Sequence, residues 1–259
     1  MDLGIRGKKA LVGGASKGLG LAAAQALADE GCEVAIISRS WENLDQAMRT
    51  FKPGQTVTSI AADLSTEEGL LACMEQADAW GSVDILVNNT GGPPAGKSMD
   101  LGDDIWRKAN ESILIFVKKM CDHFVPPMRN RKWGRVITIT SLTVREPVEN
   151  LVLSNVYRAG VTAYLKGLAR EVAGDGITVN SIMPGAYLTE RYEQLIANTM
   201  SVTGKKRDEV ASEILARLPQ GRFQHPAELG AITAFLASEK ASAITGAAIP
   251  AEGGMLRGM

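Results

Sequence analysis

The stretch Gly13-Gly14-Ala15-Ser16-Lys17-Gly18-Leu19-Gly20 lies between a short apolar run at residues 9–12 and an alanine- and leucine-rich run at residues 21–27. The first run predicts a buried strand and the second predicts a helix. Glycines in the turn between them let the backbone bend tightly, and the free N–H groups of a helix start attract negative charge. Strand, turn and helix in this order predict a seat for the phosphates of a dinucleotide, with an ordinary tight turn as the alternative.

Apolar runs typical of buried strands recur at residues 33–38, 57–64 and 84–88, with helical patterns between them. Strands that alternate with helices at this spacing indicate an α/β fold with a parallel, doubly wound sheet of the Rossmann type. Ligands of such folds bind beyond the carboxyl ends of the strands. Asp63 and Asn89 fall at two of these ends, so both are candidates for contact with a ligand.

The composition favours one domain that acts on a small molecule. The chain has 259 residues and a net charge of −1, and no linker-like stretch divides it, so we expect a single domain over residues 1–259. Its scattered basic residues predict no nucleic-acid or anionic-membrane surface. The sequence has no apolar run of about 20 residues and no basic-then-apolar signal peptide, so the protein is expected in the cytoplasm.

The cysteines and histidines do not show the spacing of metal ligands. Cys32, Cys73 and Cys121 lie far apart in apolar surroundings, which favours reduced thiols in the core over disulfides or a metal site. His123 and His225 have no ligand-like companions, so we expect structural roles for both and predict no metal.

The second predicted strand ends in Ser38-Arg39. In a dinucleotide site of this design, an acidic residue near this point holds the ribose 2′-hydroxyl of NAD, whereas a basic residue accommodates the 2′-phosphate of NADP. Arg39, with Lys17 of the glycine turn close by, therefore predicts NADP(H) in preference to NAD(H). The alternative is that Arg39 only ends the strand in solvent.

Further motifs follow the glycine turn in a fixed order over nearly the whole chain. They are Asp63-Leu64, Asn88-Asn89-Thr90-Gly91, Asn110, Gly134-Arg135-Val136, Ser141, Asn180-Ser181-Ile182-Met183-Pro184-Gly185 and Ala251-Glu252-Gly253-Gly254. With this order and spacing the chain resembles the short-chain dehydrogenases/reductases, most closely their classical, ketoacyl-carrier-protein-reductase-like branch. The resemblance implies a seven-stranded sheet between helices in one domain that assembles as a homotetramer or dimer.

The resemblance also implies which residues bind the cofactor. They are Gly14, Ser16, Lys17, Gly18, Leu19 and Gly20 in the turn, Arg39, Asp63 and Leu64 around the adenosine, and Asn89, Arg158, Pro184, Gly185 and Thr189 toward the nicotinamide. Two positions depart from the family pattern. Gly13 stands where the family usually has threonine, and Thr90 stands where it usually has alanine. Neither change is expected to abolish binding.

A larger departure concerns the catalytic residues. The family uses a serine, a tyrosine thirteen residues later and a lysine four residues after that. The lysine lowers the pKa of the phenol, which then exchanges a proton with the substrate oxygen as hydride moves. Counting from Ser141 gives Ser154 and then Arg158, in a register that the flanking sequence supports without a gap. Ser154 and Arg158 therefore replace the usual Tyr/Lys pair.

Neither replacement can transfer a proton as a tyrosine does. Ser154 is too weak an acid to take the place of a phenol of pKa about 10. Arg158 can bind ribose hydroxyls, but as a permanent cation it cannot shuttle protons at neutral pH. The remaining candidate donors are Tyr157, Tyr187 and a water held by Ser141 and Asn110. Aromatic packing is the alternative role for the two tyrosines.

Three functions are compatible with these residues. The first, which we favour, is an NADP(H)-dependent oxidoreductase that acts on a carbonyl or alcohol substrate with a non-standard proton donor. The second is a partner subunit that binds the cofactor without turnover, and the third is a non-redox lyase or isomerase. Residues 189–224 are mostly polar, with apolar residues at helical spacing, and the resemblance implies a lid over the substrate there. A surface for a partner protein is the alternative role of this segment.

Overall fold

A computed structural model describes residues 1–258, apart from the side chains at positions 191, 194, 195, 198 and 202. Seven strands form one sheet in the order β3-β2-β1-β4-β5-β6-β7, and all neighbouring strands are parallel. The predicted parallel, doubly wound sheet is thus confirmed. The strands are β1 (Lys9–Val12), β2 (Glu33–Ser38), β3 (Val57–Ala61), β4 (Ile85–Asn88), β5 (Gly134–Ile139), β6 (Ile177–Pro184) and β7 (Ala248–Ala251).

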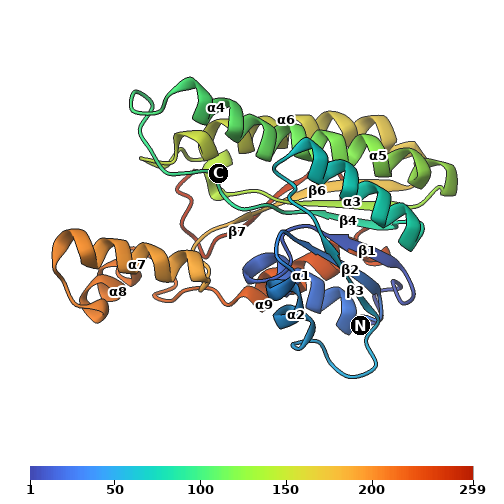
Figure 1. Cartoon of the computed structure of the whole chain (residues 1–259), viewed down its shortest axis with the longest axis horizontal. Coiled ribbons are helices and arrows are strands. Elements are labelled where there is room, and N and C mark those ends of the chain that lie inside the picture. Colours follow the sequence, from blue (N-terminus) through green and yellow to red (C-terminus); the bar gives the residue numbers. More distant parts are fainter. Residues whose placement is uncertain (259) are drawn as a thin grey trace.

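Helices cover both faces of this sheet (Figure 1). The α-helices are α1 (Gly18–Asp29), α2 (Trp41–Met48), α3 (Glu67–Trp80), α4 (Asp103–Ala109), α5 (Phe116–Arg131), α6 (Val152–Val172), α7 (Glu190–Thr203), α8 (Arg207–Leu215) and α9 (Pro226–Ala237). A π-helix, η1 (Asn110–Ile115), joins α4 to α5, and the 3₁₀ turns are η2 (Leu142–Val144), η3 (Ala173–Asp175) and η4 (Glu239–Ala241).

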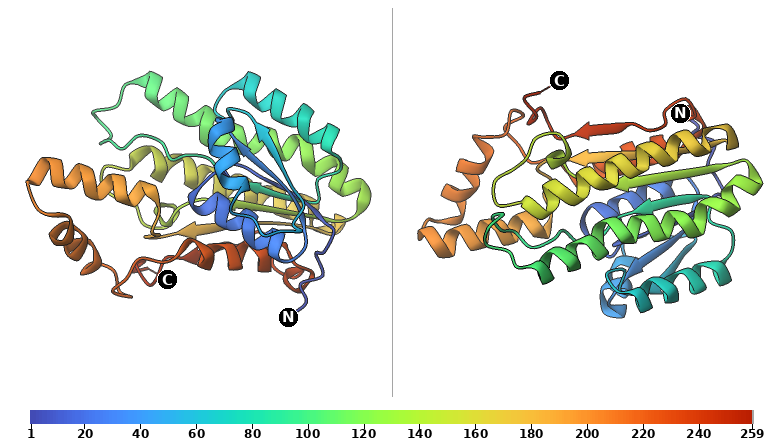
Figure 2. Two further views of the ribbon diagram at one scale, coloured as in Figure 1. Left: turned by 60° about the horizontal axis from the view of Figure 1, so that its bottom comes forward. Right: turned by 90° about the horizontal axis from the view of Figure 1, so that it is seen from above.

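The residues of β1 show how the two cores arise. Successive side chains of a strand point to opposite faces. Leu11 packs in the core beneath α3, α5 and α6, whereas Ala10 and Val12 pack in the core beneath α1, α2 and α9. Figure 2 shows these two helical layers with the sheet between them. The sheet is apolar on both faces, as expected for parallel strands between helices.

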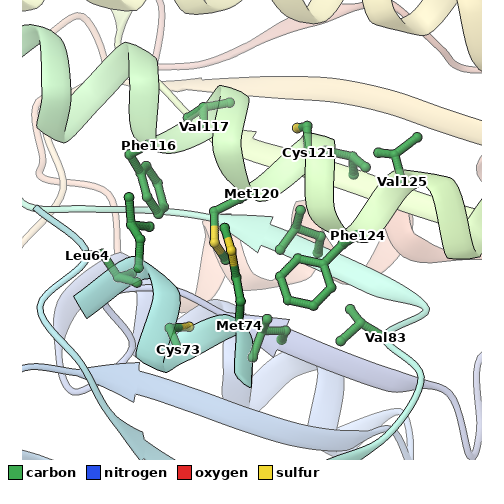
Figure 3. Close-up of a cluster of buried hydrophobic side chains, with 14 of the residues drawn as sticks. Leu64, Cys73, Met74, Val83, Phe116, Val117, Met120, Cys121, Phe124 and Val125 are labelled. Carbon is green, nitrogen blue, oxygen red and sulfur yellow. The ribbon is translucent and has the colours of Figure 1, made fainter. Parts of the chain in front are cut away.

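Sulfur-containing side chains fill much of the core between α3 and α5 (Figure 3). Met74 and Met120 meet there, and Cys73 and Cys121 lie on the same two helices. Burial raises the pKa of each of these two thiols to about 12. Both cysteines are therefore protonated and unreactive at neutral pH, which suits a packing role.

The third strand is shorter than the sequence predicts. It ends at Ala61 rather than at residue 64, because Asp63 turns the chain. The Asp63 carboxylate accepts hydrogen bonds from the N–H and the hydroxyl of Ser65, at 3.0 and 2.6 Å. The turn takes Asp63 and Leu64 out of the sheet and leaves them at its carboxyl end.

The helices α7 and α8 project together from one end of the molecule (Figure 1). An ion pair of 2.8 Å between Arg207 and Glu193 ties them to each other. They follow β6 and therefore start at the edge where the strands end, as a lid would require. Among residues 1–258 no helix is both long and apolar enough to cross a bilayer.

Candidate functional site

The glycine turn after β1 is built for close backbone approach. Gly14 and Gly18 have φ angles of +55° and +59°, a region that favours glycine. A Cβ at Gly20 would lie only 2.3 Å from the Gly14 carbonyl oxygen, so a side chain there would force the turn apart. The Asn89 amide, at the end of β4, donates to the carbonyls of Gly13 and Gly14 at 3.2 and 3.3 Å. These bonds hold a cradle at the start of α1, where glycines and free backbone N–H groups suit a pyrophosphate.

Two serines join this turn to the end of β2. Ser38 Oγ donates to Ser16 Oγ at 3.0 Å. Lys17 and Arg39 follow these serines directly in the chain, so both cations lie at the same corner of the sheet. The Lys17 ammonium is paired with the carboxylate of Glu190, the first residue of α7.

Asp63 and Leu64 close the adjacent corner, beyond β3. Leu64 is buried, whereas Asp63 is partly exposed. Partial burial raises the pKa of Asp63, but the hydrogen bonds from Ser65 and the positive charge of Arg39 outweigh it, so the pKa lies below its ordinary value. Asp63 is therefore ionised at neutral pH and able to accept a hydrogen bond from an amine.

Ser141, Ser154 and Arg158 come together where β5 ends and α6 begins. Ser141 caps η2, and its Oγ accepts the Thr143 N–H at 3.2 Å. Thr143 Oγ1 lies 3.1 Å from Ser154 Oγ, and both side chains are buried. Four residues further along α6, Arg158 Nη1 donates to the Ile139 carbonyl at 2.9 Å and lines a small pocket at the ends of β4 and β5.

The two candidate tyrosines both make packing contacts. The Tyr157 hydroxyl donates to the Trp106 carbonyl at 2.9 Å, and the two rings meet edge to face with centroids 5.8 Å apart. The Tyr187 side chain is buried in the core beneath α9, where desolvation raises its pKa to about 12. Burial also raises the pKa of Tyr157. Their role as proton donors stays a prediction.

Asn110 is the first residue of the π-helix η1. π-Turns inside α-helices are frequent at functional sites, because the extra residue frees a backbone carbonyl and redirects neighbouring side chains. Here the Ser112 carbonyl accepts a hydrogen bond from the Thr90 hydroxyl at 3.2 Å. Thr90 thus ties the loop after β4 to the turn that carries Asn110.

The remaining predicted cofactor residues lie at the end of β6 and directly after it. Pro184 ends the strand, and the Gly185 N–H donates to the Ala251 carbonyl at 3.2 Å. A Cβ at Gly185 would lie 2.7 Å from Glu252 Cα, so the residue must be glycine. Thr189 is the residue directly before α7, and its methyl group would lie 3.7 Å from a Cβ at Gly18. The start of α7 therefore lies against the glycine turn.

Comparison with known proteins identifies the family. A family model described as Enoyl-(Acyl carrier protein) reductase matches residues 14–256. The chain belongs to the short-chain dehydrogenases/reductases.

Two named relatives and one crystal structure illustrate the similarity. The 3-oxoacyl-(acyl-carrier-protein) reductase FabG of Escherichia coli is 33% identical over 98% of this chain and 99% of its own length. The NADPH-dependent reductase BacG of Bacillus subtilis is 29% identical over 96% of this chain and 98% of its own. The crystal structure of L-sorbose reductase from Gluconobacter frateurii, complexed with NADPH and L-sorbose, superposes with a TM-score of 0.95 at 33% identity over 100% of both chains.

The structure gives a reason for one departure from the usual pattern of the short-chain dehydrogenases/reductases. A Cβ at Gly13 would lie 2.7 Å from the Asn89 backbone oxygen and 3.2 Å from Leu64 Cδ1. Glycine in place of threonine thus lets the end of β4 pack directly on the turn. Sequence reasoning missed Thr143, which no local motif marks, and Glu190, whose position next to Thr189 was the available signal.

Proposed function

We propose that this chain is an NADPH-dependent reductase of a carbonyl substrate, in which a water held by Ser141 and Asn110 supplies the proton that a tyrosine supplies elsewhere in the family. The observation that carries the proposal is the placement of Ser141 just after β5. It is linked to Ser154 through Thr143, the Arg158 guanidinium binds the carbonyl of Ile139 at the end of β5, and the glycine turn lies at the same edge of the sheet.

The preference for NADPH rests on charge. Arg39 and Lys17 present two cations at the corner where β2 ends, and no carboxylate stands at position 39. A ribose 2′-phosphate is stabilised by such cations, whereas a free 2′-hydroxyl prefers an acid. The NADPH in the L-sorbose reductase structure and the relative BacG, an NADPH-dependent reductase, support the same choice.

In the proposed chemistry, Ser141 and Arg158 stabilise the substrate oxygen, and a bound water supplies the proton that a phenol would otherwise supply. The bound cofactor would supply hydride to the carbonyl carbon. Ser141 Oγ already accepts the Thr143 N–H, so its own O–H can donate a hydrogen bond to the substrate oxygen while Ser141 keeps its proton. The Arg158 charge favours the developing oxyanion but cannot provide its proton, since guanidinium stays protonated in proteins. The alkoxide oxygen formed by hydride transfer therefore takes its proton from the bound water, and the hydroxide left behind is reprotonated by solvent.

The test begins with binding and continues with turnover. Isothermal titration with NADPH measures the affinity, and oxidation of NADPH is then followed over a panel of ketones, ketoses, quinones and acyl thioesters. We expect binding and turnover with at least one substrate class, and we expect S141A to lower kcat/KM by about 100-fold with the NADPH affinity retained. Failure to bind either NADPH or NADH would exclude any redox role.

A second candidate is a subunit that binds NADPH without turnover. The hydrogen bond of Tyr157 to Trp106 and the burial of Tyr187 favour it, because both phenols are engaged in packing. Tight NADPH binding with no oxidation by any member of the panel would support this function over the first.

Assembly as a homotetramer or dimer belongs to the same proposal. It rests on the family resemblance of the whole chain, and sedimentation velocity of the purified protein measures it directly.

A further inference from the structure

The first residue of the lid contacts the glycine turn through an ion pair. Glu190 opens α7, Lys17 precedes the first turn of α1, and their side chains are paired although 173 residues separate them in the chain. Both side chains are more than half exposed, at 63% and 58%. The pair therefore lies in solvent at the rim of the cradle, where a ligand could compete for either partner.

Lys17 also lies at the corner where a ribose 2′-phosphate is expected. The hydrogen bond between Ser16 and Ser38 fixes the turn beside the end of β2, and Arg39 follows at the next position. Arg39 in turn faces the Asp63 carboxylate, whose pKa it helps to lower. Each cation of this corner thus has one carboxylate as a neighbour, and the carboxylate of Lys17 comes from the lid.

We propose that Glu190 is a specificity-determining residue for the cofactor. Its carboxylate forms an ion pair with the Lys17 ammonium. A 2′-phosphate that binds Lys17 must therefore share the ammonium with this carboxylate or displace it. Glu190 therefore weakens the binding of NADPH and leaves the binding of NADH, which lacks this phosphate, unchanged. The inference rests on the proposed function, because it takes Lys17 as a ligand of the 2′-phosphate.

The size of the effect follows from the exposure of the pair. Exposed ion pairs contribute little, and removal of a competing carboxylate from such a pair changes an affinity by about two- to fivefold. Added salt screens exposed charges, so the effect is expected to shrink as the ionic strength rises.

The experiment compares dissociation constants of the full-length protein and the E190Q variant for NADPH and NADH. Two smaller probes, 2′,5′-ADP and 5′-AMP, carry the same phosphate difference without a nicotinamide. The matched control is E193Q, because Glu193 also lies in the first turn of α7 but pairs with Arg207 inside the lid. The variant Lys17→Met, alone and combined with E190Q, completes a double-mutant cycle.

We expect E190Q to tighten NADPH and 2′,5′-ADP about two- to fivefold, to leave NADH and 5′-AMP unchanged, and to lose its effect once Lys17 is replaced. E193Q should change none of the four constants. The inference would be overturned if E190Q changed the dissociation constants of NADPH and NADH equally, and those of 2′,5′-ADP and 5′-AMP equally, or changed none of them. Either result would leave the proposed function standing. If the unaltered protein binds neither NADPH nor NADH, the proposed function fails first and the inference fails with it.

Discussion

The Ser154 hydroxyl lies 3.1 Å from the Thr143 hydroxyl, and both side chains are buried. Counting along the sequence from Ser141 predicts that Ser154 stands at the position where the family carries its catalytic tyrosine. The Ser154 hydroxyl points to Thr143, a residue of η2. The Thr143 N–H in turn donates a hydrogen bond to Ser141 Oγ. Ser154 is thus linked to Ser141 through Thr143, and we expect it to support Ser141 rather than to transfer a proton.

This pairing predicts a structural role for Ser154. S154A leaves a buried hydroxyl at Thr143 without its partner, so we expect the free energy of unfolding to fall by about 1–3 kcal/mol. The value of kcat/KM should change far less than the roughly 100-fold expected on removal of a general acid. Urea unfolding and steady-state kinetics measure the two quantities. The double variant S154A/T143V should recover part of the stability; loss of turnover in S154A with NADPH binding intact would instead make Ser154 catalytic.

Three tyrosines are expected to lose their phenolic protons only at a higher pH than a free tyrosine does. Burial raises the pKa of Tyr157, Tyr164 and Tyr187, in the last case to about 12. We therefore expect these phenols to show no phenolate absorbance at 295 nm until the pH exceeds about 10, their ordinary pKa. The titration is best done on Y192F, which leaves only these three of the four tyrosines. A phenol that ionises below about pH 9 and disappears in Y157F or Y187F would restore a tyrosine as the proton donor.

The fold was predictable because its signals are local. The glycine turn, the apolar runs and their alternation with helical patterns each lie within a few residues, and parallel strands bring their ends to one edge whatever the details of packing. Gly14, Asp63 and Asn89 could therefore be assigned to a common edge before the structure was known. The bonds between Asn89 and the turn show that two of these ends are in direct contact.

The pairings inside the site were not predictable, because they depend on contacts between distant segments. Lys17 and Glu190 lie 173 residues apart, and neither residue type signals the other. Tyr157 could be placed near Ser154 by helical spacing, but its hydrogen bond to the Trp106 carbonyl depends on how α4 packs on α6. Spacing along a helix predicts which residues share one face of it. Which segment packs against that face depends on the tertiary structure.

The glycine cradle predicts a sharp contrast between two Gly→Ala variants. At Gly20 the added methyl group meets the Gly14 carbonyl at 2.3 Å and the Asn89 amide at 2.7 Å. We expect G20A to lose about 1–3 kcal/mol of stability and most of its NADPH affinity. G167A, on the exposed face of α6 with nothing within 4 Å of its new Cβ, should gain up to about 1 kcal/mol and bind normally. Calorimetric unfolding and NADPH titration test both, and normal binding by G20A would contradict a close-fitting phosphate seat.

The start of α9 predicts an acid-sensitive contribution to stability. Glu228 accepts two hydrogen bonds from Arg222, at 2.7 and 3.0 Å, and one from the His225 N–H at 2.7 Å. These bonds and the nearby positive charge lower the pKa of Glu228 to about 2.

A carboxylate whose pKa is lower in the folded state stabilises the fold fully above its unfolded pKa, about 4.3, and loses that contribution as the pH falls toward 2. We therefore expect E228Q to be less stable than the unaltered protein at pH 6, and the difference to narrow between about pH 4.5 and 3. Urea midpoints across this range measure it. The control E75Q removes an exposed carboxylate from the middle of α3 and should show no such narrowing; a difference between E228Q and the unaltered protein that stays constant with pH would mean that Glu228 acts through packing rather than through its charge.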